Sequence, residues 1–144
     1  MSMVDVTEKP DVYREAEAEG IIKLKSETID RIFKGMVEKG DVLTVAKVAA
    51  IQAIKKTSEI IPLCHNIPIT GAEVFIEKAS NEEVKVRVRV RTNAKTGVEM
   101  EALTGVAVAL LSIWDMVKKY EKNADGSYPY TEIKSIKVTY KVKK

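Results

Sequence analysis

Asp115 is an acidic side chain within the most apolar stretch of the chain. It follows Leu110-Leu111-Ser112-Ile113-Trp114, and Lys118 and Lys119 come three and four residues later. On a helix such lysines lie beside the carboxylate. A carboxylate in apolar surroundings costs free energy unless it is paired, and a partly buried Asp–Lys pair tunes both pKa values for proton transfer. Asp115 and Lys118 are therefore candidate catalytic residues, with a purely structural ion pair as the equal alternative.

A second pair of carboxylates, Glu99 and Glu101, follows Gly97. Residues two apart share one side of an extended segment but lie about 200° apart on a helix. If both serve one site, Glu99 must precede the helix; the alternative is that both acids only stabilise the helix N-terminus. Glu101 and Asp115 are 14 positions apart, which is about 21 Å along a helix. If Glu101 and Asp115 both contact one substrate, that substrate must be long, such as a triphosphate, or the site must be built from two subunits.

Cys64 and His65 are the only cysteine and the only histidine of the chain. This scarcity excludes a zinc site built from several such ligands within one subunit. Neighbours in an extended segment point to opposite sides, so the two are a poor nucleophile–base pair, and we expect Cys64 to pack as a small side chain. His65 is a candidate general acid, base or phosphate ligand, although a hydrogen-bonded structural histidine is the more frequent case.

Basic side chains offer a competing function. Residues 84–91 alternate valine with a basic side chain, which predicts a strand with Arg87, Arg89 and Arg91 on one face. Such a face could bind a nucleotide or nucleic acid, but a solvated sheet face is the favoured interpretation. Lys55 lies near the end of a predicted helix. It could interact with the negative end of the helix dipole or bind a ligand, and the sequence favours neither role. The net charge of +3 is too balanced for a protein that coats nucleic acid.

Composition limits the class of protein. A chain of 144 residues, 45% hydrophobic and 31% charged, suits one domain with a substantial core. One cysteine cannot form an intrachain disulfide, which favours a reduced, intracellular compartment. The first residues lack a secretory signal, and the apolar stretch 102–117 falls short of a membrane span. We therefore expect a soluble cytoplasmic protein.

The elements that must position these side chains follow from periodicity and turn residues. Residues 1–11 are expected to be a mobile N-terminal arm, and residues 12–144 a single domain. The patterns predict a strand within 13–25, helices at 26–36 and 42–58 with Ser26 and Asp41 as caps, hairpin strands at 73–77 and 84–91, a helix ending near 122, and a strand at 136–142. The order predicts an α+β two-layer sandwich on a mostly antiparallel sheet. The last helix is apolar almost all round, which predicts packing against another subunit.

The same residues lie in stretches that resemble the cyclic pyranopterin monophosphate synthase family of molybdenum cofactor biosynthesis. Matching stretches occur in family order from residue 3 to about 122, and the most specific are 61–65 (IPLCH) and 95–103 (KTGVEMEAL). The chain departs from the family at Asn66, where proline often follows the histidine, and at residues 140–144, where many relatives have a glycine-rich tail. The resemblance implies a ferredoxin-like fold and a homohexamer, a trimer of dimers with sites between subunits.

The resemblance further implies a lyase that acts on a small molecule, the cyclised dihydroguanosine triphosphate made from GTP. The products would be cyclic pyranopterin monophosphate and diphosphate. No metal or other cofactor is implied, with Mg²⁺ assistance to the triphosphate left open, and neither nucleic acid nor membrane is an expected partner. By matching position, the catalytic residues would be Asp115, Lys39 and Lys118, and the substrate-binding residues would be Leu63, Cys64, His65, Glu99, Met100, Glu101, Arg14, Lys55 and Lys141.

Overall fold

The computed structural model describes residues 1–144 as four helices and four strands. In chain order these are β1 (Val12–Lys23), α1 (Ser26–Lys34), α2 (Val42–Lys55), α3 (Thr57–Ile60), β2 (Gly71–Ser80), β3 (Glu83–Ala94), α4 (Glu99–Glu121) and β4 (Glu132–Lys143). The predicted order is confirmed, with the short α3 as an addition where the second predicted helix was expected to continue. Residues 1–11 contain no helix or strand, and their separation from the domain as a mobile arm stays a prediction.

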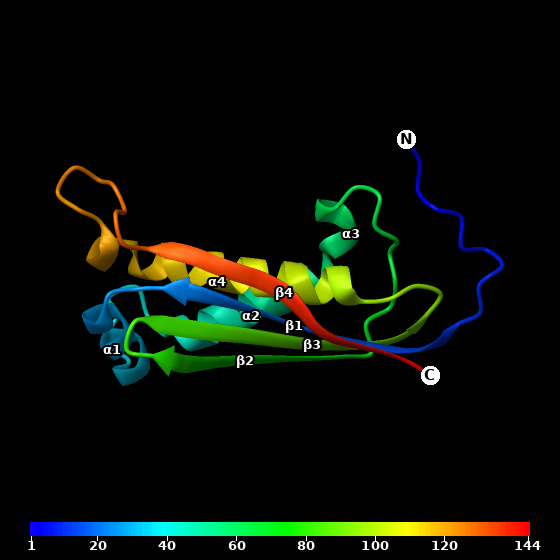
Figure 1. The fold of residues 1–144 in the computed structure, drawn as a ribbon, viewed down its shortest axis with the longest axis horizontal. Helices are drawn as coiled ribbons and strands as arrows, with labels where there is room; N and C mark the ends of the chain where they lie inside the picture. The colour runs from blue at the N-terminus through cyan, green and yellow to red at the C-terminus, as the bar shows by residue number, and fades with distance from the viewer.

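The four strands form one antiparallel sheet in the order β2-β3-β1-β4. β1 lies inside the sheet because the helical crossovers bring later strands to both of its sides. The long helices α2 and α4 pack together on one face of this sheet (Figure 1). The predicted α+β sandwich is therefore confirmed, and its strand order is the ferredoxin-like one.

The core lies between the sheet and the two long helices. Val84, Val86, Val88 and Val90 of β3 are completely buried, which confirms the alternation expected for this strand, and the basic side chains point to the other face. The approach of α4 to β1 is close at Gly20, where a Cβ atom would lie 2.8 Å from the carbonyl oxygen of Ser135 and 2.7 Å from a methyl group of Val106. The sheet therefore needs glycine at this position.

We expect Gly20→Ala to lower the free energy of unfolding by about 1–3 kcal/mol, the usual cost of overpacking a filled core. Urea denaturation followed by circular dichroism measures this loss. Gly71→Ala is the matched control on β2, because its nearest contact would be an ordinary 3.6 Å. Equal stabilities of the two variants would contradict the argument from packing.

Two predicted helix caps have different outcomes. Asp41 caps α2, since its carboxylate accepts a hydrogen bond from the backbone N–H of Thr44 at 3.2 Å. The prediction for Ser26 was wrong, because α1 begins at Ser26 itself and no side chain caps it locally. Instead, the carboxylate of Glu121, at the end of α4, accepts hydrogen bonds from the Lys25 N–H and the Thr28 hydroxyl. A distant acidic side chain thus fixes the start of α1 through Lys25 and Thr28, and no side chain caps the helix N–H groups.

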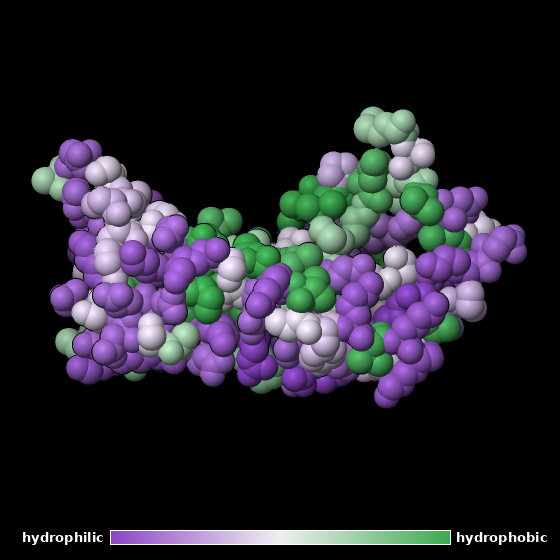
Figure 2. All heavy atoms as spheres, in the orientation of Figure 1, coloured by the Kyte–Doolittle hydropathy of each residue, from purple (hydrophilic) through white to green (hydrophobic).

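One side of α4 remains uncovered within the subunit. Its buried side includes Val106, Leu110 and Ile113, whereas Leu111 keeps 56% of its surface exposed. By length and composition alone α4 could cross a membrane, contrary to the sequence expectation, but half of its most apolar window is buried inside the protein. Apolar atoms gather in a hollow along α4 and β4, between α3 and the loop before β4 (Figure 2). The exposed apolar side chains Leu111, Ile136 and Val138 belong to these two elements.

Candidate functional site

The loop after α3 brings three of the predicted residues against the start of α4. Pro62 follows the end of α3, and the Cys64 N–H closes a turn by donating to the carbonyl of Ile61. A cavity of about 340 Å³ results, with both apolar and acidic walls. Its lining residues are Ile61, Leu63, Cys64, His65, Thr96, Gly97, Glu99 and Met100. Leu63, Cys64, His65, Glu99 and Met100, all predicted to bind substrate, therefore share one cavity.

Glu101 lies behind this cavity as a buried acid. Only 3% of its surface is exposed, and its Oε2 atom lies 3.8 Å from the Cys64 sulfur. Burial, followed by the charge of Glu99, raises the pKa of Glu101. Burial and the nearby carboxylates also raise the pKa of the Cys64 thiol, so the thiol stays neutral and is a poor nucleophile. This agrees with the interpretation of Cys64 as a packing residue, although it is only half-buried.

The two carboxylates lie near the same cysteine, although both belong to the helix. Glu99 is the first residue of α4 rather than a residue before it. Besides burial, the charges of both Glu101 and Glu99 nevertheless raise the pKa of the Cys64 thiol. Gly97 makes this arrangement sterically accessible, because a Cβ there would lie 2.3 Å from Glu99 Oε2. Lys141 of β4 lies 3.3 Å from the other carboxylate oxygen of Glu99. Glu99 thus does not precede the helix, and the service of both carboxylates to one substrate stays a prediction.

The raised pKa of Glu101 predicts a pH dependence of stability. Its ordinary value is 4.5, so above pH 4.5 the folded chain keeps a proton that the unfolded chain releases, and stability falls as pH rises toward the folded pKa. Glu101→Gln removes this loss, so its stability relative to wild type should increase through that pH window. Urea denaturation at a series of pH values measures the difference, with exposed Glu59→Gln as the control. Parallel profiles for Glu101→Gln and wild type would contradict the assignment.

His65 contacts the N-terminal segment, which the sequence led us to expect as a mobile arm. Its Nε2 atom lies 2.6 Å from the carbonyl oxygen of Val4, and Lys95 donates a hydrogen bond to the carbonyl of Thr7 at 2.9 Å. The N-terminal segment thus borders the site. These contacts use backbone carbonyls, so no residue type in the segment could have indicated them.

Arg14 and Lys55, two of the predicted cationic contacts, lie in different environments. Arg14 is 9% exposed and donates hydrogen bonds to the carbonyls of Ala94 and Lys95, both at 3.2 Å. These bonds hold the connection from β3 to α4, which forms one wall of the cavity. Lys55 is exposed at the end of α2. A direct contact of either cation with substrate stays a prediction.

The catalytic candidates form a second group at the other end of α4. The Asp115 carboxylate lies between two ammonium groups, 3.4 Å from Lys39 Nζ and 3.3 Å from Lys118 Nζ. The hydrogen bond from Lys118 and the charge of Lys39 lower the pKa of Asp115, so this group is ionised. The expected partial burial was wrong, because 61% of the Asp115 side chain is exposed. The carboxylate faces out of α4 on the side where the apolar helix has no cover within the subunit.

An open cavity of about 320 Å³ adjoins this second group. It is lined by Leu111, Trp114, Asp115 and Lys118, which share one face of the helix because of their spacing. Tyr128, from the loop before β4, packs edge-on against Trp114 with a ring separation of 5.2 Å. The cavity therefore combines an apolar wall with one ionised carboxylate and an amine.

The two groups do not meet within one subunit. Glu101 and Asp115 both belong to the continuous helix α4, and 14 residues of helix correspond to about 21 Å. The separation expected from the sequence is thus present in the structure, with the apolar hollow of Figure 2 along the same helix.

Comparison with known proteins decides the family. A family model described as "MoaC family" matches residues 3–143. The chain belongs to the MoaC family. A probable cyclic pyranopterin monophosphate synthase of Saccharolobus solfataricus is 57% identical, with 98% of this chain and 94% of the relative covered. Proteins of the same description from Pyrococcus furiosus and Methanosarcina acetivorans are 54% and 55% identical, covering 99% and 98% of this chain and 91% and 89% of theirs.

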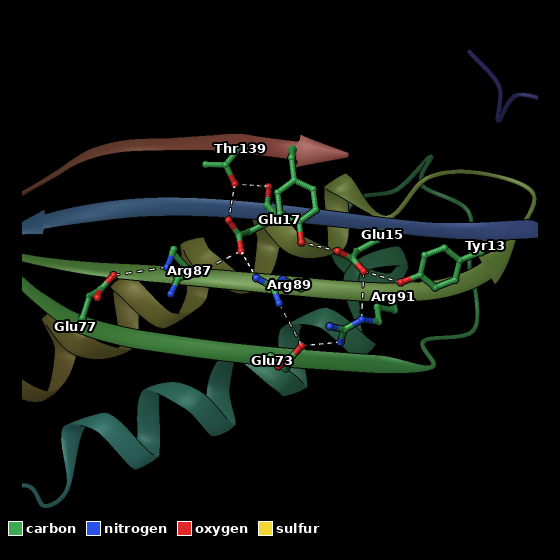
Figure 3. Close-up of polar contacts among 10 residues, drawn as sticks. Tyr13, Glu15, Glu17, Glu73, Glu77, Arg87, Arg89, Arg91 and Thr139 are labelled. Carbon is green, nitrogen blue, oxygen red and sulfur yellow. Dashed lines mark hydrogen bonds and ion pairs between the residues drawn. The ribbon is translucent and has the colours of Figure 1, made fainter. Parts of the chain in front are cut away.

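The basic strand of this MoaC-family chain is internally neutralised. On the sheet face away from the helices, Arg87 and Arg89 both pair with Glu17, at 3.4 and 3.2 Å, and Arg91 pairs with Glu15 and Glu73 at 3.3 and 2.6 Å (Figure 3). Hydrogen bonds, first from Tyr13 and then from Tyr140, lower the pKa of Glu15. The arginines are therefore already committed to carboxylates, which does not favour the nucleic-acid alternative.

Proposed function

We propose that this protein is a cyclic pyranopterin monophosphate synthase of molybdenum cofactor biosynthesis. The observation that carries the proposal is the nearly full-length match to relatives of that name, in a chain that has an ionised Asp115 between two lysines. The reaction would be that of a lyase. It converts the cyclised dihydroguanosine triphosphate into cyclic pyranopterin monophosphate and releases diphosphate.

In the proposed mechanism, the lysine–aspartate group carries out the proton transfers. Asp115 and Lys39 are the acid–base pair, and Lys118 holds the second carboxylate oxygen of Asp115. The ammonium groups also stabilise negative charge as diphosphate departs, in the manner of a preorganised electrostatic site. The cavity residues Leu63, Cys64, His65, Glu99 and Met100, with Glu101 behind them, bind and orient the substrate.

A second copy of the chain would complete the site. The two groups are about 21 Å apart along α4, and the uncovered apolar side of this helix offers a surface that another subunit can bury. Dimerisation would place the cavity of one subunit opposite the lysine–aspartate group of its partner. We propose a hexamer built from three such dimers, as the resemblance implies, with Lys141, Lys55 and Arg14 supplying further positive charge near the triphosphate.

No resident cofactor enters the proposal. No three side chains of the metal-binding types His, Cys, Asp and Glu group together in the structure, and the proposed chemistry uses lysines and carboxylates alone. Mg²⁺ would reach the site only as part of the substrate, bound to its triphosphate. The proposed location is the cytoplasm.

Incubation with the cyclised triphosphate intermediate tests the function. We expect stoichiometric release of diphosphate together with a product that oxidises to a fluorescent pterin. Lys39→Ala is the matched control for contaminating activity, because Lys39 is exposed and its loss should leave the fold intact. Absence of both products with folded wild-type protein would overturn the proposal.

A further inference from the structure

The catalytic candidate Lys39 lies in a connection, not in a helix or strand. Two glycines with positive φ, Gly35 at 69° and Gly40 at 130°, bound this connection between α1 and α2. Val37, 8% exposed, inserts into the core, and the Gly40 N–H donates to the Val37 carbonyl at 3.1 Å. Because Lys39 itself is exposed, packing does not hold its side chain, and its position depends on the backbone of its neighbours.

Tyr120 supplies one of the polar anchors of this connection. The Lys119 ammonium also pairs with the Glu38 carboxylate, and the Arg31 guanidinium donates to the Met36 carbonyl at 3.3 Å. Its phenolic oxygen accepts a hydrogen bond from the backbone N–H of Glu38 at 3.0 Å. The Tyr120 ring is held in turn by cations, with the Arg31 guanidinium 4.6 Å and the Lys119 ammonium 5.5 Å from its centroid. The residue directly before Lys39 is therefore tied to the last turns of α4.

The same helix carries the partners of Lys39. The lysine donates to the Asp115 carbonyl at 3.1 Å and to its carboxylate at 3.4 Å. One helix therefore carries Asp115, Lys118 and Tyr120. A connection anchored on Tyr120 keeps Lys39 at a constant distance from the Asp115 carboxylate.

We propose that Tyr120 is a positioning residue that holds Lys39 against Asp115 through the Glu38 backbone N–H. The inference rests on the proposed function, in which Lys39 and Asp115 form the acid–base pair. Tyr120 itself does not touch the substrate. It increases the fraction of molecules in which the lysine is ready for proton transfer.

Tyr120→Phe isolates the hydrogen bond, since the ring and its cation contacts remain. A net hydrogen bond corresponds to roughly a 3- to 10-fold change in population, so we expect kcat to fall about 3- to 10-fold. KM should change by less than about 2-fold, because the cavity at the other end of α4 is untouched. The double-mutant cycle is read on the pKa of Asp115, because Lys39→Ala removes turnover. In a Lys39→Ala background Tyr120→Phe should leave that pKa unchanged, as expected for residues that act through one another. Equal pKa changes in both backgrounds, or a wild-type kcat for Tyr120→Phe, would overturn the proposal.

A second measurement does not depend on turnover. Lys39 and Lys118 are the cations that face Asp115, so release of Lys39 should raise the Asp115 pKa measured by carbon-13 NMR titration. Tyr13→Phe is the matched control: it also removes a phenolic hydroxyl beside a lysine, Lys144, but on β1, 102 positions from Asp115 in the chain. An Asp115 pKa unchanged by Tyr120→Phe overturns the positioning role. A raised pKa in a protein without synthase activity supports it while overturning the proposed function.

Discussion

Asp115→Asn is expected to reduce turnover by about 10²- to 10⁴-fold, the usual contribution of a positioned acid or base. The substitution keeps the size of the side chain but removes the charge that Lys39 and Lys118 face. Because 61% of the side chain is exposed, the stability of the fold should remain that of wild type. Diphosphate release under single-turnover conditions measures the loss, and circular dichroism verifies the fold.

Asp30→Asn is the appropriate control for Asp115→Asn, because Asp30 is also an exposed helical aspartate. This control should turn over the intermediate at the wild-type rate. A folded Asp115→Asn protein with wild-type turnover would remove Asp115 from the mechanism. It would leave the cavity around His65 and Glu101 as the remaining candidate for the chemistry.

Glu121→Leu should cause the largest loss of stability among single substitutions of polar residues. Glu121 is completely buried and accepts hydrogen bonds from the Lys25 N–H and from the hydroxyl groups of Thr28 and Thr131. Leucine would leave these donors without an acceptor, at a cost of about 1–3 kcal/mol for each donor that cannot find another partner. We expect a total loss of about 2–5 kcal/mol, measured by urea denaturation.

The comparison with Glu121→Gln separates hydrogen bonding from packing. The amide retains one acceptor oxygen, so this variant should lose less stability than Glu121→Leu. Exposed Glu132→Gln, close by on β4, should be neutral. If Glu121→Leu were as stable as wild type, the hydrogen bonds that join α1, α4 and the start of β4 would make no net contribution to the free energy of unfolding.

Local patterns in the sequence predicted most of the fold, because those patterns report burial directly. The alternation of β3 and the Asp41 cap each need only neighbouring residues, and both are confirmed. Ser26 failed as a cap because α1 begins one residue earlier than a Ser26 cap requires, and the residue that holds this start, Glu121, is 95 positions from Ser26 in the chain. No local pattern can indicate a hydrogen bond of that kind, in which a distant carboxylate reaches a helix N-terminus.

Some features of the candidate site were likewise predictable from the sequence, and others were not. Residue types and the family resemblance pointed to Asp115, Lys39 and the residues around Cys64, and the structure brings them into two groups. The exposure of Asp115 was missed because an apolar helix sequence does not reveal which of its sides the rest of the chain leaves uncovered. The contact of Tyr120 with Glu38 was missed because the donor is a backbone N–H. Every residue type other than proline carries this group, so the identity of residue 38 gives no indication of the contact.

The continuity of α4 has a consequence for how the protein can evolve. Each residue of a helix adds about 1.5 Å and turns the chain by about 100°. One residue inserted between Glu101 and Asp115 would swing Asp115 away from Lys39, whereas most substitutions on the exposed side would leave both ends in place. The exposed side of this segment should therefore tolerate replacement of one apolar residue by another far better than the segment tolerates any change in its length.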